Sequence, residues 1–172
     1  MRKLIHLLNE ARAVLPSLLL LGVAATRAPH FAAHNGPGIR ILALGPRNVQ
    51  FNTCEDDVRQ ALLLLARFDP RRMARVSACI RFVFVASVCK GGFYLHPGKI
   101  CLLNFASIPG QYAPTARHVA LAGMLVHEAT HGLLNSRKIP YCGRLSARIE
   151  NLCELEQVRC VRRLARAGAE DR

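Results

Sequence analysis

The residues best placed to do chemistry are two histidines and a glutamate in the segment 125–133, L-V-H-E-A-T-H-G-L. His127 and His131 are four positions apart, so on a helix their side chains project to nearly the same side. Neutral imidazoles placed in this way can bind one zinc ion, and Glu128 can then accept a proton from a metal-bound water. A buried histidine pair can also be held by structural hydrogen bonds alone. A third ligand at a suitable distance decides between these interpretations.

Candidate third ligands lie on a later segment with helical periodicity. Its apolar positions are Ile149, Leu152, Cys153, Leu155, Val158, Val161 and Leu164, and the same segment carries Glu150, Glu154 and Glu156. Eighteen residues separate His131 from Glu150, which gives the pattern H-E-x-x-H-x18-E. A second helix therefore offers a carboxylate to the histidine pair.

This pattern resembles that of the gluzincin metallopeptidases, in which two helices supply two histidines and a glutamate to one zinc ion. The resemblance implies that His127, His131 and Glu150 bind a single Zn²⁺ and that Glu128 is the general base. Glu154 is the alternative third ligand. The resemblance covers about residues 115–160, and it implies hydrolysis of a peptide bond in a peptide or protein substrate.

Two further roles are implied by the same resemblance. Thermolysin-like enzymes carry an acidic residue four positions after the ligand glutamate, where it hydrogen-bonds a ligand histidine, and Glu154 has that spacing here. They also carry a tyrosine before the third ligand that stabilises negative charge on the substrate oxygen, and Tyr141 matches it in position. The chain is also similar to small bacterial proteins that contain H-E-A-T-H followed by R-x-E-x-x-C, here Arg148, Glu150 and Cys153.

An alternative function is a basic, zinc-containing binding protein without turnover, associated with a membrane or with nucleic acid. A structural zinc site has no need of a general base, so Glu128 favours the enzyme. Structural sites are usually closed by four protein ligands, so Cys153 as a fourth ligand would favour the binding protein. No G-x-M-E-N motif typical of aminopeptidases is present, so the resemblance leaves the substrate open.

The charge of the chain is strongly positive. It contains 24 Lys and Arg residues against 11 Asp and Glu residues, a formal net charge of +13. Such a balance favours anionic partners, but no nucleic-acid-binding motif accompanies it, so a nucleic-acid partner is not expected. The seven cysteines form no C-x-x-C pair, and their odd number favours thiols in a reducing environment, although one bridge such as Cys89–Cys101 stays open.

The sequence patterns of the helices and strands around the site predict an α+β fold. We expect a minimal zincin-like domain in which a small antiparallel sheet packs against the active-site helix and the C-terminal ligand helix. The patterns predict strands at 39–44, 49–51, 80–86, 93–95 and 99–105, and helices at 53–67, 71–76, 115–136 and 146–166. Thr53 and Thr115 are predicted N-caps, with Glu55, Asp56 and Asp57 in a first helical turn. Strand 99–105 is the predicted sheet edge that would hold an extended peptide.

The N-terminal part differs in composition from the rest. We divide the chain into residues 1–35, an apolar helix or possible signal or membrane-associated segment, and residues 36–172, the zincin-like domain. The uncharged run 13–26 is too short for an ordinary membrane span of about 20 residues. A helix packed on the domain or on a membrane surface, through residues 1–27, ranks ahead of a signal peptide, so a cytoplasmic or membrane-associated location is favoured over export.

Overall fold

Four strands form one mixed sheet in the computed structural model, which describes residues 38–44, 49–86, 92–104, 113–141 and 144–170. The strands are β1 (Arg40–Leu44), β2 (Phe82–Ala86), β3 (Gly92–Leu95) and β4 (Ile100–Asn104), in the order β1-β2-β4-β3. Strands β1, β2 and β4 run parallel, and only β3 runs antiparallel, against β4. The α+β class is confirmed, whereas the prediction of an antiparallel sheet is wrong. Two helices connect β1 to β2, and such a crossover makes neighbouring strands parallel.

The predicted peptide-binding edge is also wrong. Strand β4, which corresponds to segment 99–105, lies inside the sheet between β2 and β3. The edge strands are β1 and β3. A 3-10 turn at His96–Gly98 precedes β4, and Lys99 has a left-handed backbone (φ 50°).

Helix α2 (Val49–Phe68) packs against strand β1 and helix α4 (Pro114–Ser136). Helix α2 buries apolar residues at helical spacing, namely Val58, Ala61, Leu62 and Leu65. It begins earlier than predicted, so residues 49–51 are helical rather than extended and Thr53 lies within the helix. Asp57 is therefore not in a first turn. Its carboxylate instead accepts hydrogen bonds from Arg117 (3.0 Å) and faces His118 Nε2 at 2.8 Å.

Helix α3 (Pro70–Cys79) has a well-defined start. Asp69 is its N-cap and accepts a hydrogen bond from the backbone N–H of Arg72 at 3.3 Å, while Pro70 occupies the first helical position. The Arg72 guanidinium also contacts the buried Asp69 carboxylate at 2.6 Å. These contacts fix the junction between α2 and α3.

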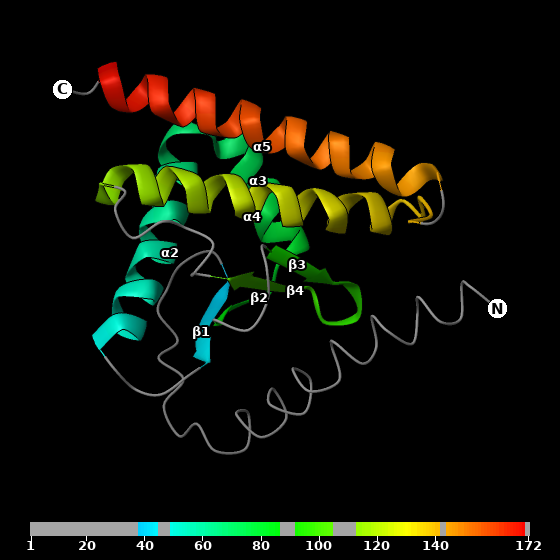
Figure 1. The fold of residues 1–172 in the computed structure, drawn as a ribbon, viewed down its shortest axis with the longest axis horizontal. Coiled ribbons are helices and arrows are strands. Elements are labelled where there is room, and N and C mark those ends of the chain that lie inside the picture. Colours follow the sequence, from blue (N-terminus) through cyan, green and yellow to red (C-terminus); the bar gives the residue numbers. More distant parts are fainter. Residues whose placement is uncertain (1–37, 45–48, 87–91, 105–112, 142–143, 171–172) are drawn as a thin grey trace. The chain divides into compact units, whose positions relative to one another are not determined.

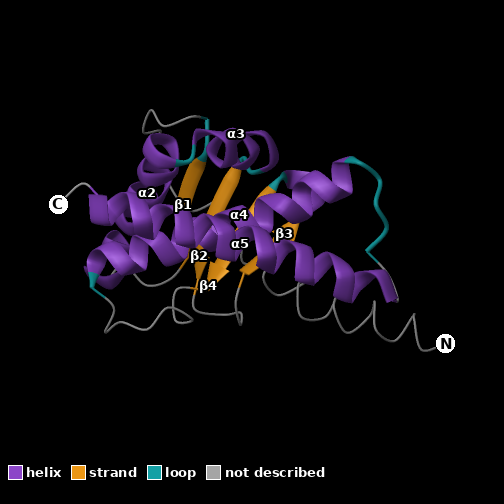
Figure 2. Ribbon diagram, turned by 90° about the horizontal axis from the view of Figure 1, so that it is seen from above, coloured by secondary structure: helices purple, strands orange, loops and turns teal. Residues whose placement is uncertain are grey.

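The two long helices form an antiparallel pair, with α4 (Pro114–Ser136) lying between the sheet and α5 (Arg144–Glu170), as Figures 1 and 2 show. Helix α4 starts at Pro114 with Ala113 as N-cap, two residues before the predicted cap Thr115. It is apolar around most of its circumference because it is covered on both sides. The predicted end of this helix at Ser136 and the predicted second helix are confirmed. Helix α5 contacts α4 rather than the sheet.

Glycines allow α4 to approach its neighbours closely. A Cβ atom on Gly123 would lie 2.7 Å from Val161 of α5. One on Gly132 would lie 2.7 Å from the Tyr94 ring of β3 and 2.9 Å from Cys79 of α3. The Tyr94 hydroxyl donates a hydrogen bond to the Cys79 carbonyl at 2.8 Å, which ties β3 to the end of α3.

The predictions for residues 1–35, including the signal, membrane and packed-helix alternatives, lie outside the described residues. No helix in the described part of the chain is long and apolar enough to span a membrane. Cys101 is a buried thiol in β4, and Cys89 lies outside the described residues.

Candidate metal centre

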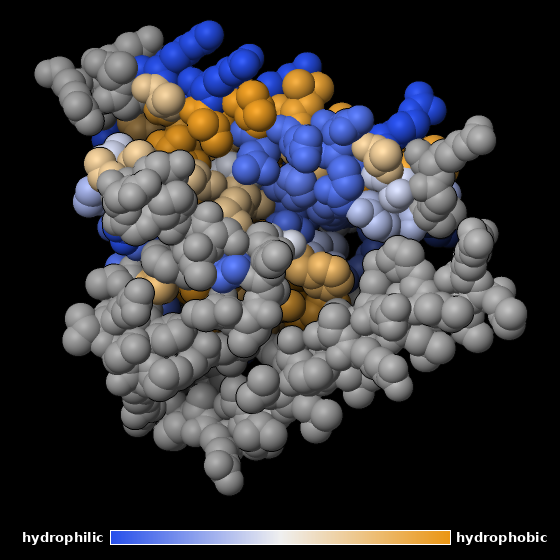
Figure 3. Space-filling model, viewed as in Figure 1, coloured by the Kyte–Doolittle hydropathy of each residue, from blue (hydrophilic) through white to orange (hydrophobic). Residues whose placement is uncertain are grey.

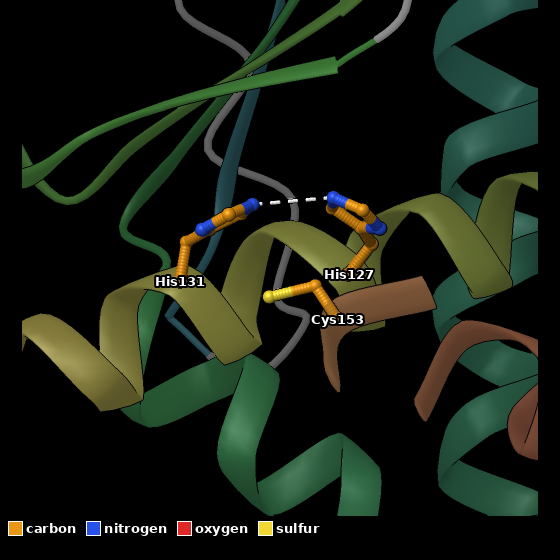
Figure 4. A group of neighbouring side chains, drawn as sticks. All are labelled: His127, His131 and Cys153. Carbon is orange, nitrogen blue, oxygen red and sulfur yellow. Dashed lines mark hydrogen bonds between the residues drawn. The ribbon is translucent and has the colours of Figure 1, made fainter. Parts of the chain in front are cut away.

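The two histidines of α4 point their rings toward one another, as Figure 4 shows. Their Nε2 atoms are 3.2 Å apart and their ring centroids 5.0 Å apart. Two nitrogens bound to one tetrahedral zinc at ordinary bond lengths lie about 3.4 Å apart. The separation of His127 and His131 Nε2 therefore fits a shared metal ion.

The carboxylate of Glu150 on α5 faces both of these nitrogens. Its Oε2 atom is 3.5 Å from His127 Nε2, and its Oε1 atom is 3.5 Å from His131 Nε2. An oxygen and a nitrogen on one tetrahedral zinc lie about 3.3 Å apart, so this separation also fits. The antiparallel packing of α4 and α5 thus brings a donor of α5 to the two donors of α4.

Tyr141 lies beside this group, at the end of the segment that connects the two helices. Its hydroxyl donates a hydrogen bond to Glu150 Oε1, and its ring packs edge-on against the ring of His131 at 5.6 Å. The side chain is also 55% exposed. Tyr141 therefore orients the candidate carboxylate ligand and remains accessible to a bound molecule.

A fourth donor lies one helical turn beyond Glu150. Cys153 is fully buried, and its Sγ atom and the ring nitrogens of His127 and His131 lie within 4.8 Å of one another. A sulfur and a nitrogen on one tetrahedral zinc lie about 3.6 Å apart. Burial, followed by the charges of Glu150 and Glu128, raises the pKa of Cys153 to about 12, which favours the neutral thiol. The buried His127, His131 and Cys153 group could bind a metal ion.

The second nitrogen of His127 is held by α5. His127 Nδ1 lies 3.1 Å from Gln157 Oε1, so the Nδ1–H can donate to the amide oxygen and leave the Nε2 lone pair directed at the site. Burial lowers the pKa of His131, which favours its neutral, metal-binding form. Both imidazoles are therefore prepared to act as ligands.

The partner of His127 is a residue that the sequence pattern did not single out. Glu154, predicted to hold a ligand histidine, is exposed on α5. Gln157 is seven positions after Glu150 and four after Cys153, so the three share one face of the helix. The spacing of Gln157 from Glu150 and Cys153 was the sequence feature that could have identified it as a contact of the site.

Glu128 is buried beside strand β3 and is only 4% exposed. The backbone of Gly92 approaches its carboxylate so closely that a Cβ atom there would lie 2.3 Å from Glu128 Oε1. Burial, reinforced by the charge of Glu150, raises the pKa of Glu128 to about 8. Such a pKa, close to neutral pH, suits a group that accepts and returns a proton.

A polar contact at Thr130, the residue before His131, fixes the helix that carries the histidines. Arg75 of α3 donates to Thr130 Oγ1 at 3.2 Å and to Glu156 Oε2 of α5 at 2.9 Å. The Thr130 hydroxyl in turn donates to the Val126 carbonyl at 2.7 Å. One guanidinium thereby links three helices next to the candidate metal ligands.

The other two histidines among the described residues lie elsewhere. His118 contacts Asp57 between α4 and α2, and His96 is exposed in the turn before β4. The chain matches no protein-family model, no curated protein and no solved structure. Its function must therefore be inferred from the site itself.

Proposed function

We propose that this chain is a zinc-dependent metallopeptidase of the gluzincin type. The observation that carries the proposal is the position of Glu150, whose two carboxylate oxygens each lie 3.5 Å from a different histidine Nε2. A chance H-E-x-x-H pattern gives no reason for a carboxylate from another helix to face both imidazoles. His127, His131 and Glu150 would hold the ion, which leaves one tetrahedral position for water or substrate.

The residues around the ion would have separate roles in the hydrolysis of the peptide bond. Bound zinc would polarise the carbonyl of the substrate and lower the pKa of a water molecule. With the metal bound, Glu128 would be the group that accepts a proton from the attacking water and returns it to the nitrogen of the departing amine. Tyr141 is exposed, and its single O–H would have to turn from Glu150 to the substrate in order to donate a hydrogen bond to the developing negative charge on the carbonyl oxygen.

Strand β3 supports a substrate that is an extended peptide. Among the described residues it pairs only with β4, so its other edge can form backbone hydrogen bonds with an added strand. Gly92 of the same strand lies against Glu128, so a peptide held there would pass next to the proposed general base. We therefore propose β3, and not β4, as the strand that binds an extended peptide.

Cys153 supports a second candidate, a basic binding protein with a structural zinc site. If its sulfur binds the ion together with the two histidines and Glu150, the site has four protein ligands and no position for substrate. Glu150 fits as a ligand in either case, because its carboxylate is within about 0.2 Å of the expected separation from each nitrogen.

Metal analysis of matched variants tests the site. We expect about one zinc per chain, and a loss of zinc affinity of about 100-fold in Glu150→Gln, since roughly 10–16 kcal/mol of binding is shared by four ligand positions. Glu154→Gln, the same substitution four residues later at an exposed position, should leave zinc binding unchanged. Equal zinc retention in both variants would refute the ligand assignment.

Cleavage of a peptide library separates the two candidates. If the chain is a peptidase, the Glu128→Gln variant should retain zinc but no longer cleave peptides. The Cys153→Ser variant should retain both zinc and cleavage. The binding protein requires that Cys153→Ser loses zinc and that the wild-type chain cleaves nothing.

A further inference from the structure

A second candidate site lies away from the metal centre, along the C-terminal half of α5. An open groove of about 590 Å³ is formed there between α5 and the junction of α2 and α3. Five of its seven lining residues are arginines, and the complete lining is Phe68, Arg72, Arg159, Arg162, Arg163, Arg166 and Ala167. None of these residues has a role in the proposed peptidase.

Helical spacing gathers four of the arginines on one side of α5. Arg159, Arg162, Arg163 and Arg166 follow the pattern i, i+3, i+4, i+7, so their side chains share a face. Arg163 Nε donates a hydrogen bond to the Phe68 carbonyl at 2.8 Å, which holds one guanidinium across the groove. Figure 3 shows strongly hydrophilic side chains projecting over α5 along the upper edge of the view.

The carboxylates near the groove do not neutralise it. Asp69 and Glu156 are engaged by Arg72, Arg75 and Arg159 at 2.6 to 3.3 Å. Arg163 Nε also lies 3.9 Å from Asp69. Among the side chains that the structure describes, which end at Ala167, no carboxylate lies within ion-pair distance of Arg162 or Arg166, and both arginines are exposed to a ligand.

We propose that this arginine groove binds a compact polyphosphate, that is, a ligand with two or more adjacent phosphate groups. Guanidinium groups form paired, charge-assisted hydrogen bonds with phosphate oxygens, and several of them are needed to balance adjacent phosphates. The volume lies in the range of small-ligand sites, about 300–1,000 Å³. A flat membrane surface fits a concave groove poorly, and only Phe68 and Ala167 offer apolar contact.

The test is a titration of the full chain with tripolyphosphate at about 0.15 M salt, where general surface attraction is screened. We expect saturable one-to-one binding. Arg162→Gln with Arg166→Gln should weaken it by at least about tenfold per guanidinium removed. A control double variant, Arg137→Gln with Arg148→Gln, removes the same charge from exposed positions outside the groove and should bind as the wild type does.

Vesicles distinguish the two sources of such a phosphate group. If the groove takes a lipid headgroup, vesicles with phosphatidylinositol bisphosphate bind, tripolyphosphate displaces them, and phosphatidylserine vesicles of equal charge do not bind. If it takes a free ligand, only tripolyphosphate binds. Repeating the titration in His131→Ala removes any contribution from chelation of bound metal.

Three results would overturn the proposal. They are the absence of saturable binding, equal weakening in the two double variants, and binding of long oligonucleotides that tripolyphosphate does not displace. The last result would identify the surface as a nucleic-acid backbone site. None of these results depends on whether the chain cleaves peptides.

Discussion

Replacing Gly132 by alanine should destabilise the fold, although the same change in the interior of a helix ordinarily stabilises it by about 1 kcal/mol. The added methyl group would lie 2.7 Å from Tyr94 Cζ, 2.8 Å from its hydroxyl oxygen and 2.9 Å from Cys79 Cβ. Cys79 belongs to a helix and cannot move aside alone. The Tyr94 ring must therefore shift and lose its hydrogen bond to the Cys79 carbonyl.

The expected loss follows from these contacts. Overpacking of a buried position costs about 1–3 kcal/mol, and the broken hydrogen bond about 1 kcal/mol. After the gain in helix propensity, Gly132→Ala should reduce the free energy of unfolding by about 2 kcal/mol. For a chain of this length the melting temperature falls by about 4–8 °C.

Urea unfolding followed by circular dichroism measures this change. Ala116→Gly, at an exposed position of the same helix, is the control for helix propensity and should destabilise by no more than about 1 kcal/mol. A Gly132→Ala variant as stable as the wild type, or more stable, would show that β3 does not pack against α4 as described.

Three further changes address the site and its supports. Gln157→Leu removes the acceptor for His127 Nδ1 and should weaken zinc binding about 10- to 100-fold, as measured by competition with a chelator. Gly92→Ala places a methyl group about 1 Å too close to the Glu128 carboxylate; zinc content should be unchanged, and kcat/KM should fall about 100-fold against a cleaved library peptide. Burial raises the pKa of Glu156, but hydrogen bonds from two arginines outweigh it and lower that pKa, so the stability from this carboxylate is present at pH 7 and is lost as the pH falls below about 4.5. Glu156→Gln should therefore destabilise at pH 7 by about 2 kcal/mol, and unfolding curves of the two proteins should converge in acid.

Local spacing accounts for the part of the site that could be predicted from sequence. His127 and His131 share a helix face because four residues make about one turn, and no distant residue is needed to establish that. The C-terminal end of α4 at Ser136 and the periodicity of α5 were equally readable, because a proline follows Ser136 four residues later. The approach of Glu150 was anticipated by resemblance, since spacing alone does not say which face of α5 meets α4.

The features that could not be predicted from sequence depend on contacts between residues that are distant along the chain. The residues of β1 and β2 are mostly apolar. Such a pattern is compatible with both a parallel and an antiparallel sheet, so it does not reveal the direction of pairing. Asp57 has the composition of a first-turn residue, yet it is the buried partner of Arg117 and His118 from another helix. Gln157 was overlooked for a similar reason, because a glutamine contacts a ligand histidine only after two helices have packed.

The pairing of α4 with α5 has a consequence for the order of folding. The three candidate ligands lie within residues 127–150, on two helices joined by residues 137–143, whereas the sheet pairs Arg40 with Phe82. Contacts close in sequence form at a lower entropic cost than distant ones. The helical hairpin can therefore gather its candidate ligands before β1 pairs with β2, but Glu128 becomes buried only when β3 docks. Metal capture and catalytic competence would then be successive events in the maturation of one chain.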